Sequence, residues 1–168
     1  MNSAVISNSA RFLLLLAAQV IIFDNLNFFG YINPYPYLLF IILYPVNGNR
    51  YGLLISSFFL GLMVDMFSNS GGVHAAACIV LAYFRPYIFK FSFGLSYEYQ
   101  TVRLNDVLTT ERFSFILLSV AIHHLTLFLL EVFKINFIWD IILRTLFSAI
   151  FTIIFVIILI YLFKPARR

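Results

Sequence analysis

Acidic, basic and histidine side chains inside apolar stretches are the residues of this sequence that could do chemistry. An ionisable group in a membrane segment is rare and usually faces protein, a partner or water. Ser57, Gly61 and Asp65 recur at four-residue steps in one such stretch, and small residues at that spacing let another helix approach closely. Asp65 is either a proton or ligand site, or a packing anchor that pairs with a cation or caps the Ser-Asn-Ser-Gly-Gly turn. We favour the anchor and expect the Ser57/Gly61 face, or the polar faces of later helices, to dock a partner helix.

A second polar stripe runs along the last apolar stretch at the same four-residue step. Its members are Asp140, Arg144, Ser148 and Thr152. Asp140 and Arg144 can pair within one helix at i,i+4. Arg144 enters its helix from the same side as Asp65 and to a similar depth. We therefore expect Arg144 to pair with Asp65 or with Glu131 across helices.

Three histidines lie in or beside apolar stretches. His123 and His124 are adjacent and point in different directions, whereas His124 and Glu131 are seven residues apart and share a helix face. No Glu-x-x-His or His-x-x-x-His pattern completes a metal site. We expect polar contacts within the bundle or to a partner helix, and neither metal nor cofactor. His74, just past Gly72, is expected to cap its helix or anchor it at the outer face.

No catalytic constellation accompanies these residues. The sequence contains no Gly-rich phosphate loop, no Gly-x-Ser-x-Gly and no pair of acids at a workable spacing. The polar groups are spread thinly along the chain, whereas a small-molecule site gathers several convergent polar groups. We therefore expect a protein that is not an enzyme.

Composition places the chain in a lipid bilayer. Hydrophobic residues make up 62% of its 168 positions and charged residues 11%, against about 45–50% and about 25% in soluble domains. The net charge of +4 resides in short loops between apolar runs. It is therefore expected to set membrane orientation rather than to bind nucleic acid.

Six apolar segments are predicted to form a single all-α transmembrane domain over residues 1–168. They cover residues 11–28, 35–46, 51–67, 73–91, 112–133 and 137–163. A straight span needs about 20 residues. The second segment, bounded by Pro34, Pro36 and Pro45, is too short and is expected to be a short or re-entrant helix. The first lacks a small-x-small cleavage site after it, so we interpret it as a retained span.

Charge predicts that both termini are cytoplasmic. Six passes place nine basic residues inside and leave Lys134 and Arg144 outside. The only sizeable loop, residues 92–111, is then cytoplasmic, and Thr109 or Thr110 is expected to cap the fifth helix. Aromatic residues are expected to be interfacial anchors. These are Trp139 and the tyrosines at positions 31, 35, 37, 83 and 87.

The region from Tyr35 to Arg85 resembles MreD, the rod-shape-determining membrane protein family of bacteria. That family shows a proline-containing short second segment, an Arg before a Gly-rich third helix, and a Gly-Leu-x-x-Asp pattern followed by Gly and small residues. The matching positions are Pro36, Tyr44, Arg50, Gly52, Gly61, Leu62, Asp65, Gly72 and Ala75. The loop 92–111 carries no family signature.

The resemblance implies a non-catalytic scaffold of the lateral cell-wall synthesis machinery in the bacterial inner membrane. Its implied partners are a bitopic MreC-like protein and, indirectly, the actin-like MreB, RodA and a class B penicillin-binding protein. The MreD family is also similar in fold to the S components of energy-coupling-factor transporters. A substrate-binding S-like component is therefore the alternative, and it predicts an outward-opening polar cavity lined by residues such as Asp65, His74, Glu131 and Arg144.

Overall fold

Helices are the regular elements of the computed structural model, which describes residues 3–26, 33–94, 108–133 and 135–162. Among these residues, five helices are long and apolar enough to cross a membrane. They are α1 (Ser3–Ile21), α3 (Arg50–Ser68), α4 (Val73–Phe93), α5 (Thr110–Val132) and α6 (Ile138–Leu162). A short 3-10 turn, η1 (Phe23–Asn25), follows α1, and another, η4 (Ile135–Phe137), precedes α6. The chain is thus an all-helical, multi-pass membrane protein, as its composition predicts.

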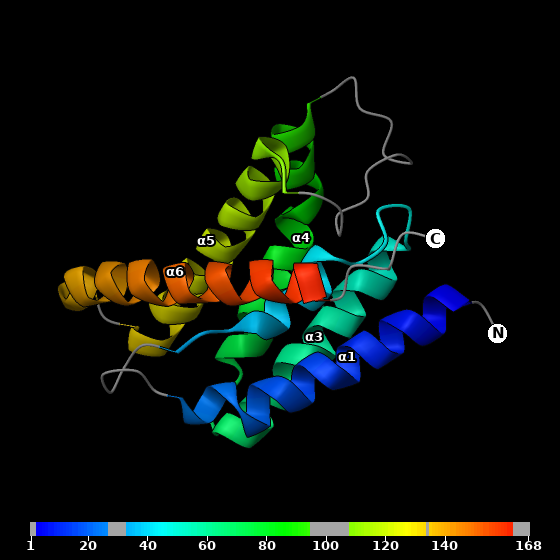
Figure 1. Cartoon of the computed structure of the whole chain (residues 1–168). Coiled ribbons are helices and arrows are strands. Elements are labelled where there is room, and N and C mark those ends of the chain that lie inside the picture. Colours follow the sequence, from blue (N-terminus) through cyan, green and yellow to red (C-terminus); the bar gives the residue numbers. More distant parts are fainter. Residues whose placement is uncertain (1–2, 27–32, 95–107, 134, 163–168) are drawn as a thin grey trace.

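The long helices pack side by side in the order α1, α3, α4, α5 and α6 around a short central segment. The helix α4 packs against both α3 and α5, α6 packs on α5, and α1 packs on α3. In Figure 1, α6 crosses in front of α5 and α4, while α1 runs along α3. The C-terminal ends of α1, α3 and α5 therefore lie together with the N-terminal ends of α4 and α6.

The two ends of the bundle differ in charge. The end that we call the acidic end carries Asp24, Asp65, Glu131 and Asp140 together with Arg144. The opposite end, the basic end, carries Arg11, Arg50, Arg85, Lys90, Glu111 and Arg112. Cytoplasmic ends of membrane proteins are enriched in Lys and Arg. The basic end thus carries the described basic residues on which the orientation predicted from the sequence rests.

The short second segment fills the centre of the bundle. It comprises the 3-10 turn η2 (Pro36–Leu38) and the helix α2 (Leu39–Ile42), which contact α1, α3, α4 and α6 between them. Residues 35–43 are all buried. At a rise of about 1.5–2 Å per residue, seven helical residues cover far less than a bilayer core of about 30 Å. The prediction of a short second helix is confirmed. Among the described helices, α1, α3, α4 and α6 pack around it.

The carbonyl groups at the end of α2 are bound by arginines from two neighbouring helices. Arg11 of α1 donates to the Leu43 carbonyl at 3.1 Å. Arg85 of α4 donates to the carbonyls of Ile42 and Tyr44 at 3.3 and 2.5 Å. The last carbonyls of a helix have no intrahelical partner, and lipid cannot supply one. The two arginines thus let a two-turn helix end inside the bundle.

Replacing Arg85 with methionine should lower stability markedly. Arg85 is only 6% exposed, and its loss leaves buried carbonyls without a donor, at a cost of about 1.5–3 kcal/mol. We expect a clearly lower midpoint of thermal unfolding in detergent. The matched control is Arg50→Met, because Arg50 is exposed and only lies over the Tyr83 ring at 5.3 Å. Equal midpoints for the two variants would contradict this role of Arg85.

Helix boundaries depart from the boundaries of the apolar segments. The helix α1 begins at Ser3, eight residues before the predicted Arg11, because no residue in between breaks a helix. Thr109 caps α5 as predicted, its hydroxyl accepting from the Arg112 N–H. The helices reach Phe93 and start again at Thr110, so the predicted loop 92–111 is shorter than expected. Residues 95–107 lie outside the described part of the chain.

Candidate functional site

Asp65 caps the start of α4. Its Oδ1 accepts hydrogen bonds from the His74 N–H at 3.0 Å and the Ser70 hydroxyl at 2.6 Å. Its Oδ2 accepts from the Ala75 N–H at 2.8 Å. The first N–H groups of a helix lack partners and carry partial positive charge, so a carboxylate is well placed there. The prediction that Asp65 caps the turn between the third and fourth helices is confirmed.

Gly61 lies one turn before Asp65 and lets α3 contact the α4 backbone. A Cβ at Gly61 would lie 2.5 Å from the His74 carbonyl oxygen and 2.6 Å from the Ala75 nitrogen. Ser57, on the same face, is fully buried. The expectation that the Ser57/Gly61 face is free to dock a partner helix is therefore corrected, because α4 of the same chain covers it. Gly72 immediately precedes α4 with φ of +96°, a conformation that favours glycine.

A buried network joins the central segment to α4 and α5. The Tyr37 hydroxyl lies 2.9 Å from His74 Nδ1 and 2.8 Å from His123 Nε2. Tyr37 and His123 are completely buried and His74 is 6% exposed. A hydroxyl can donate one hydrogen bond and accept another, so Tyr37 satisfies a ring nitrogen of both histidines. His74 was expected at the interface, and this contact shows that its ring belongs to the core.

His124 forms a second polar link, to α6. Its Nδ1 donates to the Val120 carbonyl at 3.0 Å, which leaves Nε2 as the acceptor of a neutral ring. The Thr152 hydroxyl therefore donates to Nε2 at 3.0 Å, while its oxygen accepts from the Tyr35 N–H at 3.0 Å. Tyr35 and Tyr37 are buried, so their prediction as interfacial anchors is wrong. Trp139 is 75% exposed, and Tyr83 and Tyr87 are also exposed; Tyr31 lies outside the described residues.

Removing the Tyr37 hydroxyl should destabilise the bundle. Tyr37→Phe leaves His74 and His123 each with an unsatisfied buried nitrogen, and hydrogen bonds of this kind contribute about 1 kcal/mol each. We expect a lower unfolding midpoint in detergent and faster hydrogen exchange in η2. The control is Tyr51→Phe, since Tyr51 is 75% exposed. A Tyr37→Phe midpoint as high as that of the control would refute the structural role of the network.

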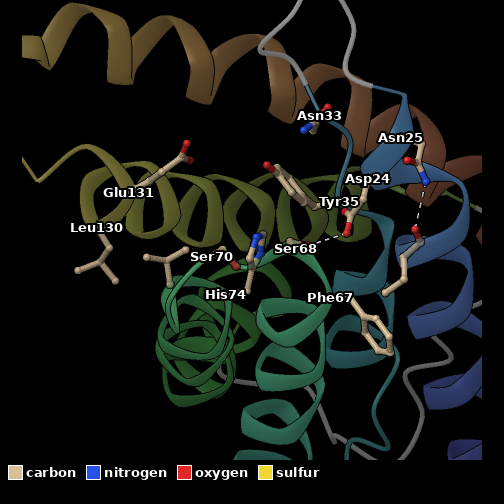
Figure 2. A pocket seen from close by; sticks show the side chains of 12 residues that line it. Asp24, Asn25, Asn33, Tyr35, Phe67, Ser68, Ser70, His74, Leu130 and Glu131 are labelled. Atoms are coloured by element: carbon tan, nitrogen blue, oxygen red, sulfur yellow. Dashed lines mark hydrogen bonds between the residues drawn. The ribbon is translucent and has the colours of Figure 1, made fainter.

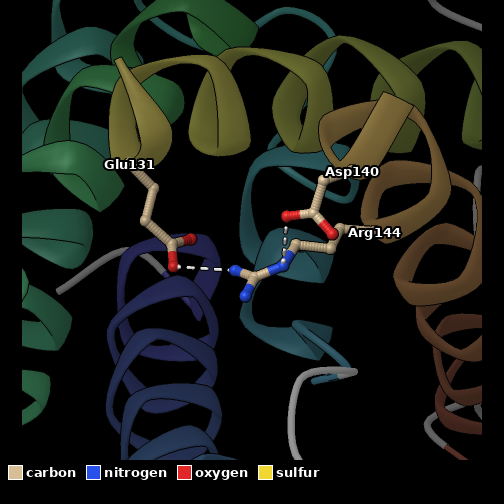
Figure 3. A network of polar contacts seen from close by, with 3 residues as sticks. All are labelled: Glu131, Asp140 and Arg144. Atoms are coloured by element: carbon tan, nitrogen blue, oxygen red, sulfur yellow. Dashed lines mark hydrogen bonds and ion pairs between the residues drawn. The ribbon is translucent and has the colours of Figure 1, made fainter. Parts of the chain in front are cut away.

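Arg144 is held by two carboxylates at the acidic end. Its Nη1 lies 3.2 Å from Glu131 Oε1 and its Nε lies 3.4 Å from Asp140 Oδ2, as Figure 3 shows. The predicted pairs with Glu131 across helices and with Asp140 within α6 are confirmed. The alternative pairing of Arg144 with Asp65 is wrong, because the helix start takes up both Asp65 oxygens.

These contacts determine the expected outcome of a double-mutant cycle. Asp65→Asn and Arg144→Gln should have additive effects on folded yield, because the two residues do not interact. Glu131→Gln and Arg144→Gln should couple, although by no more than about 1 kcal/mol at their side-chain exposures of 45% and 26%. Coupling of Arg144 to Asp65, without coupling to Glu131, would overturn this arrangement.

A polar pocket of about 710 Å³ opens beside this network. Its lining comes from the acidic ends of α1, α3, α4 and α5 and from the chain before η2. The lining residues are Val20, Asp24, Asn25, Asn33, Tyr35, Phe67, Ser68, Ser70, Val73, His74, Leu130 and Glu131. Figure 2 shows Tyr35 and His74 between Glu131 on one side and Asp24 on the other.

Asp24 is fixed in the pocket wall by two neutral donors. Its Oδ1 accepts from Gln19 Nε2 at 2.7 Å, and its Oδ2 accepts from the Ser68 hydroxyl at 2.6 Å. The second bond joins η1 to the end of α3. The carboxylate is thus oriented, but neither donor compensates its charge.

The pocket includes only part of the site predicted from the sequence. His74 and Glu131 line it, and Gly61, Asp65 and Gly72 position the start of α4 that carries His74. Ser57, His124 and Arg144 do not line it. Sequence reasoning missed Asp24, Asn33 and Tyr35. A signal for Asp24 was its acidic side chain within the first apolar segment, residues 11–28, whereas Tyr35 carried no sign of burial.

Within the described ranges, no group of three His, Cys, Asp or Glu side chains could hold a metal ion. No family model, curated protein or solved structure matches the chain.

Proposed function

We propose that the chain is a non-catalytic membrane adaptor of the bacterial cell-elongation machinery, similar to MreD, in the inner membrane with both termini cytoplasmic. The observation that carries the proposal is the filled centre of the bundle. Residues 35–43 occupy the space between the long helices, and His123 and His124 are both used in internal hydrogen bonds. A bundle filled in this way offers other proteins its helix surfaces.

The residues that carry the resemblance to MreD also support the proposal. Gly61, Asp65, Gly72 and Ala75 together form the joint between α3 and α4. The four matching positions therefore belong to one structural unit, the contact between α3 and the start of α4.

The proposed contact with an MreC-like transmembrane helix lies on α6, since α4 covers the Ser57/Gly61 face. Large apolar residues on α6 recur there at four-residue steps with 43–54% exposure. They are Ile142, Leu146, Ile150, Ile154 and Ile158. A photo-crosslinking residue at Ile150 should capture the partner, whereas one at the equally lipid-accessible Ile55 of α3 should not.

Affinity capture of the tagged chain in mild detergent tests the adaptor function. We expect an MreC-like protein to co-purify, followed by RodA, a class B penicillin-binding protein and MreB. An unrelated multi-pass protein with the same tag is the control. Recovery of an ATPase module in place of the wall synthases would overturn the proposal.

A substrate-binding S-like component is the second candidate function, and the pocket favours it. Its volume lies within the range of about 300–1,000 Å³ found for ligand sites. Two of the four residues expected to line such a cavity, His74 and Glu131, do so. An adaptor that also has a ligand pocket is compatible with both the filled centre of the bundle and the pocket at its acidic end.

A further inference from the structure

We propose that the pocket at the acidic end binds an organic cation through its ammonium or guanidinium group. The juxtaposition that carries this inference is that of Asp24, Glu131, Tyr35 and His74 around one cavity. The inference rests on the second candidate function, a substrate-binding S-like component, in which this pocket is the ligand site. It does not depend on the adaptor function.

The charge of the pocket calls for a cation. Asp24 and Glu131 line it, and its described lining contains neither Lys nor Arg. Among the described residues, the side-chain donors to Asp24 are the neutral Gln19 and Ser68. A partly buried carboxylate without a counter-charge is costly, and a bound cation would offset that cost.

Glu131 is only partly compensated by protein. Its partner Arg144 also contacts Asp140, so one guanidinium serves two carboxylates. The Glu131 side chain is 45% exposed, which leaves it accessible from the pocket. Among the described residues, a ligand cation between Glu131 and Asp24 would therefore meet two acids, one of which shares the guanidinium of Arg144 with Asp140.

His74 supplies an independent indication of a ligand. The residue is only 6% exposed, yet it lines the pocket. Its Nδ1 is bound to Tyr37, while its Nε2 makes no hydrogen bond to any other described residue. Nε2 of the neutral ring can accept a hydrogen bond, or donate one if the other tautomer is present. A polar ring edge that faces a pocket while its residue is otherwise buried is suited to a ligand group.

Aromatic rings complete a cation site. Tyr35 packs against His74 with ring centroids 5.4 Å apart and lies between the two acids in Figure 2. Phe67 forms part of the same wall. Cations bind the faces of aromatic rings within about 6 Å. An anion would be repelled here, and a neutral polyol would leave the two carboxylate charges uncompensated.

Calorimetric titration of the full-length chain in nanodiscs tests the proposal with a matched pair of probes. N-acetylargininamide carries a guanidinium, and N-acetylcitrullinamide is its neutral isostere. We expect the cation to bind at least about tenfold more tightly, which corresponds to about 1.4 kcal/mol. Raising the salt concentration should weaken cation binding, because part of the attraction is screened.

Variants locate the binding. Asp24→Asn and Glu131→Gln should each weaken cation binding about fivefold or more and leave the neutral probe unaffected. Glu111→Gln is the control, since Glu111 is exposed at the basic end. If Asp24→Asn disturbs folding through its contact with Ser68, Glu131→Gln still tests the site. Equal binding of the two probes, absence of binding, or insensitivity to both variants would overturn the proposal.

The strength of binding distinguishes two sources of the same chemistry. A micromolar Kd for the isolated probe indicates a free solute as the natural ligand. Charge-selective binding in the millimolar range, lost in both variants, indicates a basic side chain delivered by a partner protein. This experiment and the affinity capture experiment test separate proposals. Cation binding can fail while the wall synthases still co-purify, and cation binding can succeed when they do not.

Discussion

Replacing Gly61 with leucine should prevent the chain from folding, rather than only weaken its binding to a partner. A Cβ at this position would lie within 2.6 Å of backbone atoms of His74 and Ala75. Backbone cannot move aside as a flexible side chain can, so α3 and α4 would have to separate. We expect a loss of more than about 3 kcal/mol, at the upper end of overpacking effects, and little monodisperse protein after size-exclusion chromatography in detergent.

Two smaller substitutions make this prediction specific. Gly61→Ala places only the offending Cβ and should already reduce the folded yield. Gly52→Ala, in the same helix, is the control, because its Cβ would meet the Tyr44 hydroxyl at 3.0 Å, at the far end of a side chain that can shift. Normal yield of Gly61→Ala would show that the helices separate more easily than their packing indicates.

Loss of the Asp65 carboxylate should be the second most damaging change. Asp65 is 5% exposed and accepts three hydrogen bonds, two of them from the N–H groups that begin α4. Asp65→Ala leaves those groups unsatisfied where water is scarce, at a cost of about 2–4 kcal/mol. We expect a much lower unfolding midpoint and increased hydrogen exchange in the first turn of α4.

The Asp65→Asn variant removes the negative charge of the side chain and keeps its shape, so it separates the contributions of the two. The amide oxygen can still accept from one N–H, while the amide nitrogen faces donors, so an intermediate midpoint is expected. Asp140→Asn is the control, because the Asp140 side chain is 51% exposed and pairs only at the surface. If Asp65→Asn unfolds at the wild-type temperature, the carboxylate is not required as a helix cap, and the proton or ligand interpretation of Asp65 regains support.

The histidine and tyrosine positions show how far sequence reasoning reached. His123 and His124 were expected to make polar contacts either within the bundle or to a partner helix, and both make them within the bundle. Tyr37 was expected to be an interfacial anchor, because tyrosine is enriched at membrane–water interfaces. Its hydroxyl is instead the shared partner of two histidines. No periodicity identifies such a contact, since its members lie 37 and 86 residues apart.

The sequence by itself determined the class of protein and the local chemistry of its helix ends. Apolar length predicts five long helices and one short segment, and residue type offers Asp65, and Thr109 or Thr110, as helix caps. These features depend on neighbours along the chain, so the sequence contains the information directly.

Only the tertiary structure decided which polar residues meet. The central position of residues 35–43 brings Tyr35 and Tyr37 to the histidines and gives Arg11 and Arg85 their carbonyl partners. The close approach of α3 and α4 buries the Gly61 face, and the neighbouring ends of α1, α3, α4 and α5 form the pocket that Asp24 lines. In a membrane bundle many faces are equally apolar, so hydrophobic pattern alone cannot select among packings, and the few buried hydrogen bonds and close backbone contacts do.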